Sequence, residues 1–121
     1  MCKTRGELEA EFTKAIIKLE KEYLGRGPLD ARTFFVDDMI LVRLRGVLTQ
    51  PEQKLAETTQ GSYLIKETRH QLFETSRPLL EAIVRETLGC GVLSFHSDVS
   101  TKRGERVVVL TVDKNLEKQF K

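Results

Sequence analysis

The sequence predicts an α+β fold: a single two-layer domain in the order αββ-α-ββ, with an antiparallel sheet packed against two main helices. A helical apolar pattern opens the chain, two pairs of short β-rich runs flank a longer helical stretch, and turn residues separate these segments. The 121 residues match the usual length of one domain. We therefore expect one domain over residues 1–121, with a core from about residue 5 to residue 116 and a frayed C-terminal tail.

Residues 5–24 are predicted to form the first helix. Thr4 and Glu7 have the spacing of a capping box, and Gly25-Arg26-Gly27-Pro28 follows as a stop signal. The apolar residues recur every three or four positions, which predicts one buried stripe that contains Leu8, Phe12, Ala15, Ile16, Leu19 and Tyr23.

Residues 32–36 and 39–47 are predicted strands, joined by a turn at Asp37-Asp38. The second strand alternates, with Ile40, Val42 and Leu44 on one face and Leu41, Arg43 and Arg45 on the other. This pattern is typical of an antiparallel sheet that is covered on one side.

Helical character follows up to about residue 88. Thr49 and Glu52 form a second predicted capping box, with Pro51 in the first turn. We expect a short helix over 51–59, weakened at Gly61 and either separate from or continuous with a long helix that kinks before Pro78. The side chains expected to cover the sheet are Leu64, Ile65, Leu72, Phe73, Leu79, Leu80, Ile83, Val84 and Leu88.

Gly89-Cys90-Gly91 is predicted to end the long helix, before strands at 92–98 and 105–112. The valine-rich run at 107–112 is the most strongly β-prone segment, so we place it inside the sheet. The polar tail from Asp113 to Lys121 is expected either to form one helical turn or to fray.

Composition excludes several classes of protein. Twenty basic residues against 18 acidic ones give a net charge of +2, too small to predict nucleic-acid or membrane binding. Cys2 and Cys90 lack the spacing of a disulfide scaffold or a zinc site, so we expect free thiols and a cytoplasmic protein. No signal region or membrane span is predicted, and no cofactor.

Few polar groups have the spacing of a chemical site. His96 and Asp98 share one face of a predicted strand, but two side chains do not make a metal site, and structural roles are favoured. The loop at 25–28 follows a helix and leads to a strand, so helix termination is favoured over phosphate binding. A basic hairpin with Arg103 and Arg106 suggests RNA contact, although a solvated surface is the favoured interpretation.

Three blocks of sequence resemble the MpsC family: Gly25-Arg26-Gly27-Pro28, the passage from Asp38 to Glu52, and Ser97-Asp98-Val99-Ser100. The resemblance covers about residues 5–116, and the middle block is the most specific. It implies an association with a sodium-translocating, membrane-potential-generating system that is also linked to bicarbonate uptake. It supplies no catalytic residues, and it implies a soluble accessory subunit that docks on membrane transporter subunits.

We therefore predict a non-enzymatic interaction protein, a homodimer that pairs through edge strands or the first helix. Two alternatives remain: an RNA-binding module that uses the basic C-terminal hairpin, and a sensor that holds a small anion with Arg26, Arg43 and Arg45. The residues predicted for an interface or site are Arg26, Arg43, Arg45, Thr49, Glu52, Arg69 and Asp98.

Overall fold

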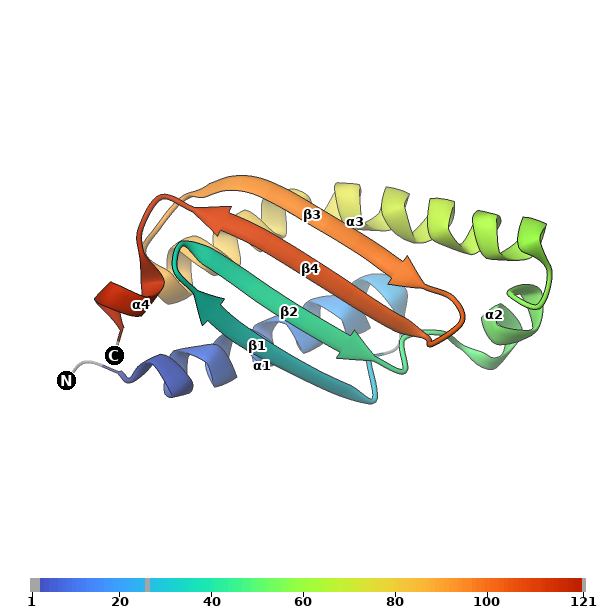
Figure 1. Cartoon of the computed structure of the whole chain (residues 1–121), viewed down its shortest axis with the longest axis horizontal. Helices are drawn as coiled ribbons and strands as arrows, with labels where there is room; N and C mark the ends of the chain where they lie inside the picture. The colour runs from blue at the N-terminus through green and yellow to red at the C-terminus, as the bar shows by residue number, and fades with distance from the viewer. Residues whose placement is uncertain (1–2, 26, 121) are drawn as a thin grey trace.

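A computed structural model, which describes residues 3–25 and 27–120, confirms the α+β class and the element order. One four-stranded antiparallel sheet lies in front of two long helices (Figure 1). The main elements are helices α1 (Arg5–Leu24), α2 (Gln50–Leu55), α3 (Thr59–Leu88) and α4 (Leu116–Gln119) and strands β1 (Asp30–Val36), β2 (Met39–Arg45), β3 (Val92–Ser100) and β4 (Glu105–Val112).

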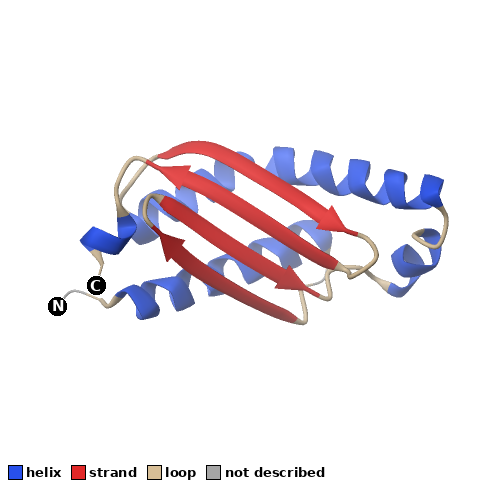
Figure 2. Ribbon diagram, viewed as in Figure 1, coloured by secondary structure: helices blue, strands red, loops and turns tan. Residues whose placement is uncertain are grey.

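The strands lie in the order β1-β2-β4-β3, so the valine-rich β4 is inside the sheet as predicted. Residues that pair across all four strands form rows, and alternate rows point to opposite faces. The row of Phe35, Ile40, Leu110 and Phe95 points toward the helices. Both α1 and α3 lie on that face, which leaves the other face of the sheet open (Figure 2).

Helix α1 has the predicted bounds and both bonds of the capping box at Thr4, and Gly25 ends it in the left-handed conformation. Leu8, Phe12, Ile16 and Leu19 are buried as expected. Tyr23 is exposed instead, because the stripe turns away from the core near the C-terminus, and Glu20 is buried in its place.

The expected helix over 51–59 is shorter and is separate from the long helix. Helix α2 ends at Leu55, and Thr58 begins α3 by accepting a hydrogen bond from the Gly61 amide. A Cβ atom on Gly61 would lie 1.8 Å from the carbonyl oxygen of Leu55, so glycine allows the two helices to meet closely. Gly61 is therefore a packing position rather than a weak point.

Helix α3 runs unbroken through Pro78 from Thr59 to Leu88. The expectation that Leu64 and Leu79 cover the sheet is wrong, because both side chains are exposed. The buried stripe follows the positions of Ile65, Phe73, Leu80, Val84 and Leu88, together with Gly61, Arg69 and Ser76. Two polar side chains thus occupy positions on the core side of α3.

The tail forms the helical turn α4 rather than fraying. Asn115 caps α4, and Leu116 is fully buried against the sheet and helices. None of the helices in the described part of the chain combines the length and the apolar character that a membrane span requires.

Candidate functional site

Arg69 holds together the end of the molecule where α2 lies. Its side chain is only 5% exposed, and it projects from α3 toward the segment between β2 and α2. Nε and Nη2 donate to the two carboxylate oxygens of Glu52 at 3.0 and 2.9 Å, and Nη2 also donates to the Val47 carbonyl at 2.6 Å. A paired guanidinium of this kind fixes both the distance and the orientation of α2.

Thr49 and Glu52 supply the other half of this contact. The Glu52 carboxylate accepts from the Thr49 amide at 2.9 Å, and the Glu52 amide donates to Thr49 Oγ1 at 3.3 Å, which confirms the predicted capping box. Burial raises the pKa of Glu52, but hydrogen bonds from Arg69 and Thr49 outweigh burial and hold it below its ordinary value. The fold therefore brings Thr49, Glu52 and Arg69 into one cluster.

A second buried ion pair joins α1 to β4. Arg106 Nη1 donates to Glu20 at 2.7 Å, its Nε donates to Ser97 at 3.1 Å, and its guanidinium lies 4.6 Å from the centre of the Phe73 ring. Burial lowers the pKa of Arg106 and raises that of Glu20, and the attraction between the two charges opposes both shifts. Arg106 is therefore a core residue, and the expectation that it lies on the surface of a basic hairpin is wrong.

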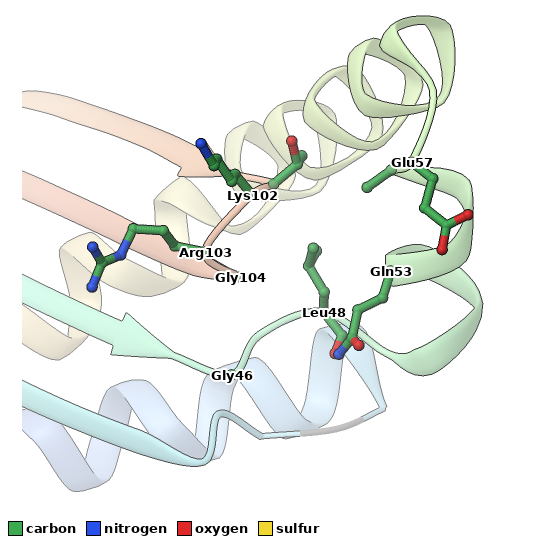
Figure 3. A pocket seen from close by; sticks show the side chains of 9 residues that line it. Gly46, Leu48, Gln53, Glu57, Lys102, Arg103 and Gly104 are labelled. Carbon is green, nitrogen blue, oxygen red and sulfur yellow. The ribbon is translucent and has the colours of Figure 1, made fainter.

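A hollow of about 510 Å³ lies beside the Arg69 cluster, between α2 and the turn that joins β3 to β4. Figure 3 shows Lys102 and Arg103 on the turn, with Gln53 and Glu57 on the opposite side. Ala56, which is partly exposed, and Leu48, which is almost completely buried, also line the hollow. Arg103 lies 3.7 Å from the Glu105 carboxylate and Glu57 lines the opposite side, so the hollow carries charges of both signs and suits a polar segment of another protein.

The same corner exposes large apolar side chains. Leu55 at the end of α2 is 47% exposed, and Tyr63 and Leu64 in the first two turns of α3 are 65% and 48% exposed. Figure 1 shows α2 and the start of α3 extending beyond the end of the sheet. We call Leu55, Tyr63, Leu64, Lys102 and Arg103, together with the hollow, the α2 corner.

The other predicted site residues do not join this cluster. Arg26 lies outside the described residues. Arg43 and Arg45 lie on the open face of the sheet, where Arg43 donates to Glu105 at 3.1 Å. Asp98 lies on the edge strand β3, 3.6 Å from the Lys66 ammonium. Arg43 and Arg45, proposed for a small-anion sensor, are thus on the open face and do not line the hollow.

Sequence reasoning missed Glu20 and the structural role of Gly61. Glu20 follows the buried Leu19 on α1, and nothing local distinguishes it from the solvated glutamates of that helix. The signal at Gly61 is its place three residues after Thr58, which is the spacing of an N-cap and the amide that it binds.

Comparison with known proteins places the chain among others of similar length. The model of the family described as "Na+-translocating membrane potential-generating system (MpsC)" matches residues 4–114. The chain is 40% identical to "Uncharacterized protein YbcI" of Bacillus subtilis (strain 168) over 120 residues, which cover 99% of this chain and 97% of the relative. It is 31% identical to "Uncharacterized protein YrhF" of the same organism, with 90% of each protein covered. No solved structure gives a significant match.

Proposed function

Because this chain belongs to the MpsC family, we propose that it is a non-enzymatic accessory protein that binds a membrane subunit of a sodium-translocating, membrane-potential-generating system. The proposed binding site is the α2 corner. The observation that carries the proposal is the exposure of Leu55, Tyr63 and Leu64 on α2 and the first turns of α3, at the same end of the molecule as the hollow that Lys102 helps to line. The family description names a Na+-translocating system, and the partners proposed here are segments of the membrane subunits of such a system.

The Arg69 cluster supports a docking role because it gives the corner a fixed shape. Helix α2 buries none of its own residues, so its position depends on the bonds between Glu52 and Arg69 and on the close contact of Leu55 with Gly61. A binding surface that is already in its bound shape loses less conformational entropy when the partner arrives. Arg69 thus acts on binding by positioning α2.

The buried polar groups also favour docking over catalysis. The carboxylates of Glu52 and Glu20 are each bound by an arginine, and these pairs hold α2 to α3 and α1 to β4. A general acid or base must be within reach of a substrate. These carboxylates instead hold the helices and strands together. What the α2 corner offers to a partner is its shape, its apolar surface and its positive charge.

The proposal is tested by affinity purification from the native cell after chemical cross-linking. The wild-type chain is compared with Tyr63→Asp and with the double variant Lys102→Glu/Arg103→Glu, each of which changes the corner. Leu79→Asp and Lys18→Glu are matched controls, because both side chains are exposed on other parts of α3 and α1.

We expect integral membrane subunits of an ion-transport system to copurify with the wild type and both controls. Their yield is expected to fall by about tenfold or more in the corner variants, the ratio that corresponds to about 1.4 kcal/mol of binding free energy. The proposal fails if no such subunit is recovered, or if the corner variants recover as much as the controls.

A further inference from the structure

The open face of the sheet is unusually apolar for a surface that faces solvent. Outward positions of a one-sided sheet are normally polar. Here the two central strands present Leu41, Val107 and Val109 outward, and Phe34 on β1 is 37% exposed beside them. An apolar area of this kind in the middle of a sheet is typical of a surface that another protein covers.

The edges of the sheet are poorer surfaces for pairing than its face. The Phe35 amide at the β1 edge already donates to the Glu9 carboxylate at 2.7 Å. At the other edge, β3 has an irregular register between Val92 and Ser94, and Asp98 places a charge there. Irregular register and charged side chains are known means of protecting an edge from further strands. Within the sheet, the face is therefore better suited to a homodimer contact than either edge.

We propose that the open face binds a second copy of this chain, with the two-fold axis parallel to the strands and between β2 and β4. This axis places β1 over β3 of the second copy and β2 over β4. Each row of paired residues then faces the same row of the second copy, in the opposite order. Packed sheets of this kind align their strands to within about 30° and lie about 10 Å apart. The inference goes beyond the proposed function, because it concerns the open face of the sheet, which among the described residues touches the α2 corner only where Arg103 pairs with Glu105.

Charge complementarity supports this axis. One row consists of Arg32, Arg43, Val107 and Asp98. It faces the same row of the second copy in the opposite order, so Arg32 of each copy lies over Asp98 of the other. In the next row, Arg45 likewise lies over Glu105. Asp98 is 82% exposed, so its side chain is free to turn from Lys66 toward the second copy.

The apolar residues match in the same arrangement. In the row of Phe34, Leu41, Val109 and His96, Leu41 of one copy lies over Val109 of the other, and Phe34 lies over the His96 ring. The apolar rows of one copy thus contact the apolar rows of the other, and the charged rows of the two copies contact each other at one end of the strands. This is the pattern of a two-fold interface in which one patch is complementary to itself.

The alternative axis, in the plane of the face but perpendicular to the strands, gives a worse match. It would place Arg45 over Met39 instead of over Glu105 of the second copy, whereas Arg43 lies over an apolar residue with either axis and keeps Glu105 of its own chain. Burying a charge without a partner is strongly unfavourable. The parallel axis is therefore the one that the register supports.

Sedimentation equilibrium at increasing protein concentration tests the dimer. We expect a dimer for the wild type, and about a hundredfold weaker association for Phe34→Glu, since the loss of a partly buried Phe is counted twice. Leu79→Glu is the control on the helical side and should leave association unchanged. Thermal melting of each variant separates lost association from lost folding. A wild type that stays monomeric at high micromolar concentration, or a dimer that Phe34→Glu leaves intact, overturns the proposal.

Charge reversal tests the pairing of Arg32 with Asp98. Arg32→Asp and Asp98→Arg each place like charges together in their own dimers, whereas a mixture of the two variants restores opposite charges at both contacts. We expect each variant alone to associate about tenfold more weakly, and the mixture to recover. Equal association of the mixture and the separate variants counts against the register.

Cross-linking tests the axis itself. Phe34→Cys and His96→Cys are made singly in a Cys2→Ser background, and Cys90 is buried. A short bis-maleimide should join the two variants when they are mixed and should join neither to itself, because β1 lies over β3 and not over β1. Self-linking of Phe34→Cys chains would indicate the perpendicular axis and would refute the proposed arrangement.

Discussion

Replacing Arg69 by methionine tests whether its ion pair holds α2 in place. Methionine keeps most of the apolar stem, so the change removes mainly the three polar contacts with Glu52 and Val47. Hydrogen bonds to charged groups contribute about 1.5–3 kcal/mol each, and loss of one member of a buried pair costs about 3–5 kcal/mol in total. The Glu52 side chain is 27% exposed and regains water, which places the expected loss near the lower limit, about 3 kcal/mol.

Urea unfolding followed by circular dichroism measures this loss. Arg85→Met is the matched control, because it makes the same substitution on the exposed face of the same helix and should change the free energy of unfolding by about 0.5 kcal/mol or less. Combining Arg69→Met with Glu52→Gln completes a double-mutant cycle, and we expect a coupling energy of about 1–3 kcal/mol. A loss below about 1 kcal/mol for Arg69→Met, with no coupling to Glu52, would refute the assigned role.

Three other variants test separate parts of the fold. Gly61→Ala should destabilise the protein although alanine favours helices, since its Cβ would meet the Leu55 carbonyl; a rise in melting temperature would contradict this. Leu116→Ala should cost about 2–5 kcal/mol in urea unfolding, as for a fully buried leucine, and a neutral result would mean that α4 frays. The charge of Glu52 should stabilise the fold fully above its ordinary pKa of 4.5, and this stabilisation should be lost as pH falls through the lowered pKa of the folded state. The free energy of unfolding of Glu52→Gln should therefore change less with acid pH than that of the wild type.

Contacts between residues close in the chain are predictable from the sequence. The capping box of Thr49 and Glu52 joins residues three apart, and the alternation of β2 distinguishes the inward Val42 from the outward Arg43. These features depend on helical and strand periodicity, which the order of residues displays directly. The element order and the position of β4 inside the sheet follow from the same signals.

Contacts between distant residues are not predictable in this way. Arg69 is a candidate site residue from the sequence, but its partners, Glu52 and Val47, lie 17 and 22 positions away. Glu20 and Arg106 are 86 positions apart, and no local pattern links an arginine on a valine-rich strand to one glutamate among several on a helix. The fold, and not the chain order, brings each pair together.

The lack of buried residues in α2 has a consequence for its motion. A six-residue helix without a buried residue of its own is attached to the rest of the fold by the carboxylate of Glu52, the contact of Leu55 with Gly61 and the short links on either side. Such a segment opens on its own at a lower free energy than global unfolding requires, so its amides should exchange with deuterium well before those of β2 and β4. A molecule that binds to α2 would slow that exchange, so the exchange rate of the α2 amides measures whether the helix is occupied.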